Sequence, residues 1–229
     1  MADAAKKALR KSMNSLLRTL PMDVVSSESQ RITDRVLAHP AFRQAQHIGV
    51  FLSFGTEYNT DQLIQHIFRE KVAKGGTLYV PQVDPIKERN SIMRLVRVPR
   101  YEDFSSPERF RSGPFGILEP STPFVPISPP TAPPPPEEVT LDDAFARARL
   151  DLIIIPGVAF DRNLGRMGRG KGMYDRFLAE CESRGLHPYK MGVAFSAQMV
   201  PEVPRDAHDI LLDAVITGAP TDGVYMRDS

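Results

Sequence analysis

The sequence predicts one α/β domain with three layers and a mostly parallel sheet. Short apolar runs alternate along the chain with segments of helical composition, and the turns between them are short. This order is typical of parallel strands that helices cover on both faces. The 229 residues suffice to bury one large core, so we expect residues 1–229 to form a single domain.

Two helices are expected before the first strand. The first covers residues 3–20, with Asp3 as its candidate N-cap and Pro21 as its end. Four of its apolar residues recur at helical spacing and are expected to face the core: Leu9, Met13, Leu16 and Leu20. The second helix covers residues 24–38 and ends before Pro40, because the residue preceding a proline disfavours helical geometry.

The first strands are short and apolar. Residues 47–54 are expected to form a strand that is covered on both faces, and residues 77–81 a second one. A helix capped by Asn59 or Thr60 connects them. Residues 91–98 alternate between apolar and polar side chains, which predicts an outer or antiparallel strand.

A proline-rich insertion interrupts the domain at about residues 120–136, where nine residues are proline. Proline neither donates to a strand ladder nor fits a helix interior, so the insertion is expected to be an exposed, dispensable loop. A docking site for a proline-binding domain is the alternative.

The second half of the chain supplies the remaining elements. A helix is expected around residues 141–149, after the insertion. Three strands follow, at residues 151–157, 189–195 and 210–217, and the first of them is expected to be buried and parallel. A further helix, over residues 174–184, precedes the second of these strands.

Composition limits the classes of function. The net charge of +1 gives no overall attraction to nucleic acid or acidic membranes, and no apolar run approaches the ~20 residues that span a bilayer. Cys181 is the sole cysteine, which excludes an internal disulfide and favours a reducing compartment. We therefore expect a cytoplasmic monomer with no nucleic-acid or membrane partner. The basic N-terminal residues are also compatible with a mitochondrial transit peptide: Lys6, Lys7, Arg10, Lys11 and Arg18.

The most informative stretch is a glycine-rich, cationic loop that follows the strand at 151–157. Its residues are Gly165, Arg166, Met167, Gly168, Arg169, Gly170, Lys171, Gly172, Met173, Tyr174 and Asp175. Glycines let backbone N–H groups approach an anion, and the start of the following helix adds about half a positive charge. The loop therefore predicts a phosphate-binding site.

The spacing within this loop excludes familiar phosphate loops. Gly172 stands where a P-loop NTPase has the Ser or Thr that binds Mg²⁺. The glycines are too close together for a dinucleotide fingerprint. A nucleic-acid loop would be accompanied by a basic face or an aromatic array, and the sequence has neither. Three cations among many backbone N–H donors favour a compact polyphosphate as the ligand of this loop.

Other charged residues could contribute to such a site. Lys6 and Arg10 share a helix face and could reach one anion, with a solvated basic face as the alternative. Asp175 falls in the first turn of the following helix, where it either holds a metal or only complements the helix dipole. An acid-rich connection offers further Mg²⁺ ligands or is a polar loop: Glu202, Asp206, His208, Asp209 and Asp213.

Together these residues resemble the 5-formyltetrahydrofolate cyclo-ligase family. The family signature resembles the run from Arg166 to Asp175 and the preceding residues 155–161. Further similarities fall in the family's order: Lys6, Arg10, Phe51-Leu52-Ser53, Glu57, residues 116–120, Asp209 and Asp213. The family usually has two tyrosines before the closing Asp, whereas this chain has Met173 and Tyr174, so any role for a phenol at position 173 is lost.

The resemblance implies an activity and a fold. Members of the family use ATP and Mg²⁺ to convert 5-formyltetrahydrofolate into 5,10-methenyltetrahydrofolate, and they release ADP and phosphate. Their fold resembles that of sugar isomerases and CoA transferases. A single-domain α/β protein with a mostly parallel sheet is consistent with that expectation.

The resemblance also implies residue roles. ATP would be bound by Lys6, Arg10 and residues 166–174. The folate would be bound by Leu52, Glu57 and residues 169–173. Mg²⁺ would be held by Asp175 and Asp209, and Arg169 or Lys171 would stabilise the transferring phosphoryl group.

Two other functions remain open on the sequence alone. A non-catalytic nucleotide- or polyanion-binding protein would keep the glycine loop without turnover, and a sugar-phosphate isomerase on the same fold would need no ATP. The presence of Glu57, Asp175 and Asp209 favours the cyclo-ligase, because a mere phosphate binder needs none of them.

Overall fold

The computed structural model describes residues 2–83, 93–107, 110–112, 118–120 and 150–227. The helix expected at 141–149 lies outside these residues, and so does the proline-rich insertion beyond Pro120. None of the helices in this described part of the chain combines the length and the apolar character that crossing a bilayer requires.

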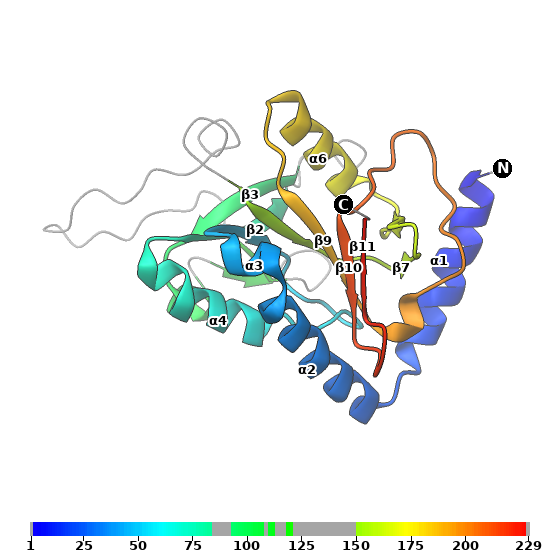
Figure 1. Cartoon of the computed structure of the whole chain (residues 1–229), viewed down its shortest axis with the longest axis horizontal. Helices are drawn as coiled ribbons and strands as arrows, with labels where there is room; N and C mark the ends of the chain where they lie inside the picture. Colours follow the sequence, from blue (N-terminus) through cyan, green and yellow to red (C-terminus); the bar gives the residue numbers. More distant parts are fainter. Residues whose placement is uncertain (1, 84–92, 108–109, 113–117, 121–149, 228–229) are drawn as a thin grey trace, which may run out of the picture.

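A seven-stranded sheet forms the centre of the molecule, in the order β11-β10-β9-β6-β1-β2-β3 (Figure 1). The strands are β1 (His47–Val50), β2 (Thr77–Val83), β3 (Met93–Val98), β6 (Leu152–Ile155), β9 (Tyr189–Ala194), β10 (Ala214–Thr217) and β11 (Val224–Met226). The inner neighbours pair in parallel, and β3 and β11 add antiparallel edges. The prediction of a mostly parallel sheet is therefore confirmed, as is the antiparallel outer strand ending at Val98.

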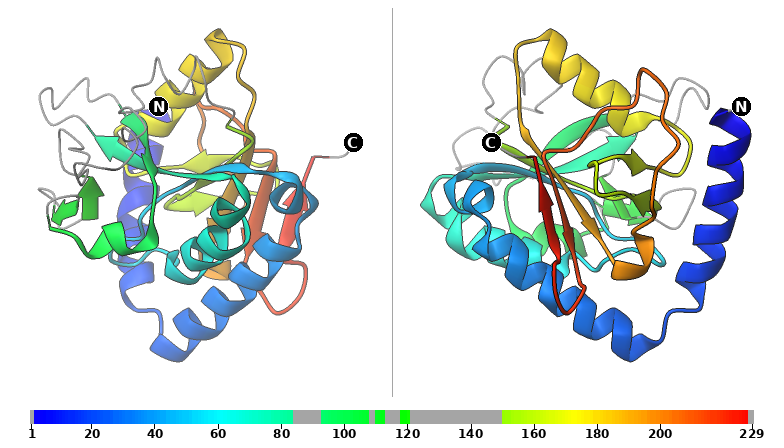
Figure 2. Two further views of the ribbon diagram at one scale, coloured as in Figure 1. Left: turned by 90° about the vertical axis from the view of Figure 1, so that its left-hand side faces the viewer. Right: turned by 45° about the vertical axis from the view of Figure 1, so that its right-hand side comes forward.

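Helices cover both faces of this sheet, which gives the three expected layers (Figure 2). The longer helices are α1 (Ala2–Arg18), α2 (Met22–Ala38), α4 (Asp61–Glu70) and α6 (Met173–Ser183), and α3 (Pro40–Gln44) is short. Three short 3-10 helices are η1 (Val72–Lys74), η2 (Tyr101–Ser105) and η3 (Ser196–Gln198). Two small antiparallel ribbons lie outside the main sheet: β4 (Phe110–Ser112) pairs with β5 (Leu118–Pro120), and β7 (Ala159–Phe160) pairs with β8 (Arg166–Met167).

Strand β6 explains why helices are needed on both faces. Successive side chains of a strand point to opposite faces. Leu152 and Ile154 join the apolar cluster under α2 and α4, while Ile153 and Ile155 join the cluster under α6. All four side chains are at most 1% exposed, so the run of apolar residues is a doubly covered central strand.

The structure corrects the expected orientation of the first helix. Leu17 is buried with 6% exposure, whereas Leu16 is 42% exposed and does not face the core. The buried face runs through Lys6, Met13 and Leu17 because the helix also turns its cations toward a cavity. Since α1 already begins at Ala2, Asp3 lies in its first turn and is not its N-cap.

Other element boundaries also differ from expectation. Strand β1 ends at Val50, and the chain then leaves the sheet. Thr60 is the N-cap residue of α4, as expected, and Asn59 Oδ1 accepts from Asp61 N at 2.9 Å. The Thr60 side chain makes no cap bond, because its Oγ1 donates to the Phe51 carbonyl at 3.0 Å. Strand β10 starts only at Ala214, and the edge strand β11 was not expected.

Candidate active site

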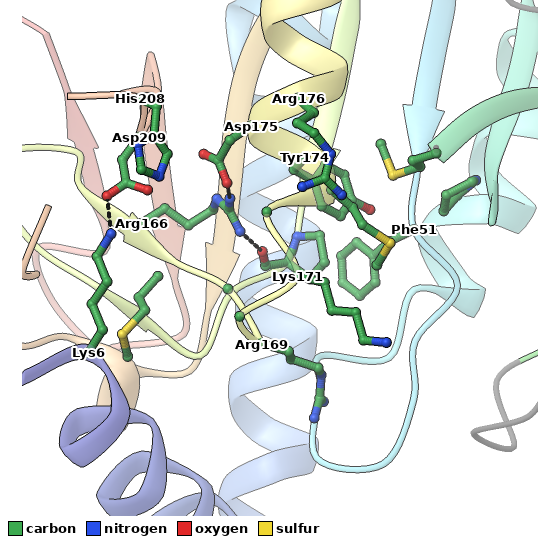
Figure 3. A pocket seen from close by; sticks show the side chains of 18 of the residues that line it. Lys6, Phe51, Arg166, Arg169, Lys171, Tyr174, Asp175, Arg176, His208 and Asp209 are labelled. Carbon is green, nitrogen blue, oxygen red and sulfur yellow. Dashed lines mark hydrogen bonds and ion pairs between the residues drawn. The ribbon is translucent and has the colours of Figure 1, made fainter. Parts of the chain in front are cut away.

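A cavity of about 630 Å³ opens where β1 and β6 end at their carboxyl termini. Ligand sites of open α/β sheets commonly lie at this edge. Every residue to which the family resemblance assigns a role lines this cavity: Lys6, Arg10, Leu52, Glu57, Asp209 and all residues from Arg166 to Asp175. The walls come from α1, the loops after β1 and β6, the glycine loop and the connection before β10 (Figure 3).

The glycine loop runs from the β7–β8 ribbon to the start of α6. Gly170 and Gly172 have φ of +99° and +58°, a region that side chains with a Cβ rarely adopt. Gly172 is the N-cap of α6, so Asp175 lies in the first helical turn as predicted. The loop therefore turns its backbone sharply and directs the helix N-terminus toward the cavity.

A buried carboxylate, Asp161, anchors this loop. Its Oδ1 accepts a hydrogen bond from Gly165 N and its Oδ2 accepts one from Val203 N, both at 2.8 Å. Leu164, in the same turn, has φ of +64°, a strained geometry that such tethers can hold. Asp161 thus joins the start of the glycine loop to the connection that carries Asp209.

Lys6 is the buried cation of the site. Its Nζ donates to Asp206 at 2.6 Å and to Asp209 at 2.5 Å, and its side chain is only 9% exposed. Burial lowers the pKa of Lys6, but the two hydrogen bonds outweigh burial and the pKa is raised overall. For Asp209, burial raises the pKa, whereas hydrogen bonds from Lys6 and from the Asp206 amide lower it below its ordinary value. Both groups are therefore charged at neutral pH.

Arg166 forms the second ion pair, at the centre of the cavity (Figure 3). Its Nη2 donates to Asp175 Oδ2 at 2.8 Å, and its side chain is 4% exposed. Asp175 Oδ1 also accepts from Ile210 N at 3.4 Å. Asp175 is therefore a paired carboxylate that faces the cavity and does more than complement the dipole of α6.

Arg169 forms the third pair, which connects the glycine loop to the loop after β1. Its Nε and Nη2 both donate to Glu57 Oε1, at 3.1 and 2.9 Å. Glu57 Oε2 accepts from Phe54 N at 3.1 Å, so the carboxylate is held from two sides. Arg169 is half-exposed and can leave this partner at low cost.

Arg10 holds the same loop through its backbone. Its Nε donates to the Gly168 carbonyl at 3.1 Å, and its guanidinium lies against Gly170, where a Cβ would approach within 3.3 Å. Lys6 and Arg10 therefore do not form a merely solvated face. The structure brings both to the same cavity as Arg166.

The opposite side of the cavity is apolar. Its wall consists of Phe51, Leu52, Pro81, Val83, Met93, Met173, Tyr174 and Ala179. Burial raises the pKa of the Tyr174 phenol, so this side chain stays neutral and acts as part of the wall. Such a wall suits a flat organic ring, while the cations opposite suit an anion.

Several lining residues were given no role in the site from the sequence. Arg176, Phe51 and Met93 contribute to the cavity, as does Asp3. Arg176 directly follows the recognised motif on α6, so helical spacing from Met173 could have found it. Met93 lies on β3 and reaches the cavity only because the sheet order places that strand near α6, which no local pattern shows.

The acid-rich connection divides into two roles. Asp206, His208 and Asp209 line the cavity. Asp213 does not, because its Oδ2 accepts from the Lys190 amide and from Lys190 Nζ, both at 2.8 Å, and so it joins the starts of β9 and β10. In the described part of the chain, no group of three or more His, Cys, Asp or Glu side chains is placed to hold a metal by itself.

Comparisons with known proteins match nearly the whole chain to one family. The model of the 5-formyltetrahydrofolate cyclo-ligase family matches residues 2–218. The chain is 30% identical to 5-formyltetrahydrofolate cyclo-ligase of Mus musculus over 215 residues, which cover 93% of this chain and 94% of the mouse protein. It is 27% identical to the Escherichia coli (strain K12) cyclo-ligase over 200 residues, 87% of this chain and 93% of that protein.

Solved structures show the same fold. The structure of Aquifex aeolicus 5,10-methenyltetrahydrofolate synthetase matches with a TM-score of 0.69 at 28% identity, and the match covers 98% of this chain and 94% of that one. A synthetase from Mycoplasma pneumoniae shares the fold with a TM-score of 0.61 at 18% identity, over 93% of this chain and 99% of that one.

Proposed function

The chain belongs to the 5-formyltetrahydrofolate cyclo-ligase family, and from this premise we propose that it closes the ring of 5-formyltetrahydrofolate at the expense of ATP. The products are 5,10-methenyltetrahydrofolate, ADP and phosphate. The observation that carries the proposal is the two-sided cavity, in which cations of α1 and the glycine loop face an apolar wall that ends near Glu57.

The reaction needs ATP because a formamide is a poor electrophile and its oxygen a poor leaving group. Transfer of the γ-phosphoryl group to the formyl oxygen creates a phosphate leaving group. Nitrogen 10 then attacks the formyl carbon and loses its proton, and phosphate departs as the ring closes. The protein therefore has to position two substrates and neutralise the charge on the moving phosphoryl group.

The cationic side of the cavity is proposed to bind the nucleotide. Lys6, Arg10 and Arg166 approach it from two elements, and backbone N–H groups of residues 166–174 surround the phosphates. Arg169 and Lys171 are proposed to stabilise the transferring phosphoryl group. Arg169 is suited to this role because it lines the cavity and is half-exposed, so it can turn from Glu57 toward a phosphoryl group.

The apolar side is proposed to bind the folate. Leu52 and Met173 would contact the pterin ring, and Glu57 would accept two N–H bonds from its 2-amino pyrimidinone edge. Glu57 Oε1 accepts from Arg169 in this structure, and the pterin edge would take the place of Arg169. Folate binding would thus free Arg169 for the phosphoryl group.

Two carboxylates are proposed to hold Mg²⁺. Asp175 and Asp209 face the same cavity. In this structure Asp175 is paired with Arg166 and Asp209 with Lys6. Mg²⁺ usually takes one or two protein carboxylates and completes its shell with substrate phosphates and water, so this pair fits the ion. The ion would neutralise phosphate charge, while Lys6 and Arg166 would turn from the carboxylates to phosphate oxygens.

A cytoplasmic monomer is proposed to carry out this reaction. Lys6 and Arg10 contribute to the site and therefore belong to the working protein, which argues against a cleaved transit peptide that includes them.

The purified protein tests the proposal directly. The absorbance of methenyltetrahydrofolate should rise when 5-formyltetrahydrofolate and MgATP are both present, and should stay flat without ATP. Lys171→Met should lower kcat by about 10²- to 10³-fold, the range for loss of one charge-stabilising group. Lys74→Met, an exposed lysine paired with Glu70, is the matched control and should leave kcat unchanged.

Two outcomes would count against this account. A flat trace with both substrates would favour a nucleotide- or polyanion-binding protein without turnover. Near-normal cyclisation by Lys171→Met would remove the proposed role of Lys171 and leave the rest intact.

A further inference from the structure

Arg176 and Lys171 bring positive charge to the apolar side of the cavity, near Phe51 (Figure 3). Arg176 sits one turn into α6, and its neighbours on the same helix face, Met173 and Ala179, also line the cavity. The side chain of Arg176 is exposed at the surface of the cavity. Neither nucleotide binding nor phosphoryl transfer, as proposed above, uses this residue.

The guanidinium of Arg176 is directed back toward the glycine loop. Its Nη1 would lie 3.2 Å from a Cβ built on Gly172, so the head group lies over the loop backbone. Figure 3 shows Arg176 and Arg169 on opposite sides of Lys171, with Phe51 beside them. Arg169 is the residue that holds Glu57. The apolar wall therefore lies between two arginines, one at the Glu57 end and one at the α6 end.

The proposed substrate has a matching distribution of charge. Its pterin is neutral and has the N–H edge that Glu57 would bind. Its other end is a glutamate, joined to the pterin through an aromatic ring, and it carries two carboxylates. When the pterin lies at Glu57 and the aromatic ring follows the apolar wall, the carboxylates reach the α6 end. An arginine is suited to that end, because its planar fork binds a carboxylate through two parallel hydrogen bonds.

We propose that Arg176 binds a carboxylate of the glutamate portion of the folate substrate, an inference that rests on the proposed function. Arg176 is then a residue that determines affinity for the folate and leaves the chemical step untouched. It distinguishes folates that carry a glutamate from pteroates that lack one.

A comparison of two substrates tests this assignment. KM and kcat are measured for 5-formyltetrahydrofolate and for 5-formyltetrahydropteroate, which lacks the glutamate, with the wild type and Arg176→Met. We expect Arg176→Met to raise KM for the folate about tenfold, the size of one lost hydrogen bond to a charged group. The KM for the pteroate, the KM for MgATP and kcat should not change. Arg176→Lys should restore part of the folate affinity.

Arg184→Met is the matched control on the same helix. Arg184 pairs with Glu180 on the surface and does not line the cavity, so its removal should change neither KM. An equal rise in KM for folate and pteroate, or a rise in KM for MgATP, would overturn the assignment of Arg176 while leaving the cyclo-ligase function in place. Absence of turnover by the wild type would overturn the proposed function, and this inference with it.

Discussion

Single residues of the site are held in pairs that substrate binding has to exchange. Lys6, Arg166 and Arg169 each hold a carboxylate that faces the cavity. A partly buried carboxylate that loses its cationic partner is costly, so each cation holds its carboxylate in place until a ligand provides a substitute. The site is therefore preorganised in its charges, and partners are exchanged when the ligands bind.

Asp161 offers a test of how the glycine loop is positioned. Asp161→Asn would direct an NH₂ group at one of the two backbone amides that now donate to the carboxylate. We expect the free energy of unfolding to fall by about 1–3 kcal/mol, the cost of one unsatisfied buried donor, together with a lower kcat. Urea denaturation and the cyclisation assay measure the two effects.

Asp222→Asn is the control for that substitution. Asp222 is exposed and has φ of +49°, a geometry that Asn adopts as readily as Asp. Equal stability of Asp161→Asn and Asp222→Asn would show that the buried carboxylate does not anchor the loop.

Site residues that are contiguous in the sequence could be predicted from their own chemistry, whereas Leu52, Glu57 and Asp209 were assigned to the site by the family resemblance. Residues 166–175 are adjacent in sequence, and their glycines and cations have a chemical meaning before any fold is known. Pro81 and Met93 are ordinary apolar residues that become part of the site only through the sheet order. The pairing of Arg169 with Glu57, 112 positions apart, has no local signal.

At the scale of elements, α1 both packs against the core and brings two cations to the cavity, and its sequence pattern does not show which residues do which. Leu9, Met13, Leu16 and Leu20 form one consistent helical stripe, and Met13 and Leu17 belong to another. In the structure Leu9, Met13 and Leu20 pack against the apolar clusters as predicted, but Leu17 is buried in place of Leu16, and the same rotation turns Lys6 and Arg10 into the cavity. Apolar periodicity alone therefore predicted the helix correctly but placed Leu16 on the wrong face.

Two alanine substitutions test this rotation. Leu17→Ala should lower the free energy of unfolding by about 2–5 kcal/mol, because it leaves a cavity in the core. Leu16→Ala removes a half-exposed side chain and should cost less than about 1 kcal/mol. Chemical denaturation of both variants gives the comparison, and a larger loss for Leu16→Ala would mean that α1 lies in the other orientation.

At the scale of the whole molecule, the site joins the two ends of the chain. Lys6 and Asp209 are 203 positions apart and form one ion pair. Their spatial proximity follows from the sheet order, in which the late strands β9 and β10 lie on the side of the sheet that α1 borders through η3. Spacing in the sequence could not predict this pair, although the family resemblance implied that both residues belong to one site.

This ion pair has a defined pH dependence. Asp209 has a lowered pKa, so its contribution to stability is present above its ordinary value of 3.8 and is lost as the pH falls through the lowered pKa. Lys6 has a raised pKa, so its contribution is present below 10.5 and is lost only as the pH rises above that value. Between these limits the stabilisation should not change with pH.

Lys6→Met measures that contribution. It should lower the free energy of unfolding by about 1–3 kcal/mol, and the difference from the wild type should stay constant from about pH 5 to pH 9. Below pH 3.8 the difference should shrink as Asp209 becomes protonated. Lys7→Met, at an exposed neighbouring lysine, should have little effect at any pH. A difference that changes between pH 5 and pH 9 would contradict the two pKa directions.

The most direct test of the account follows the formyl oxygen. If the γ-phosphoryl group is transferred to that oxygen, 5-formyltetrahydrofolate labelled with ¹⁸O in the formyl group should yield inorganic phosphate that carries the label. One labelled phosphate should form for each methenyltetrahydrofolate and each ADP. Unlabelled phosphate alongside normal product formation would contradict phosphoryl activation of the formyl oxygen, and with it the roles proposed for the glycine loop.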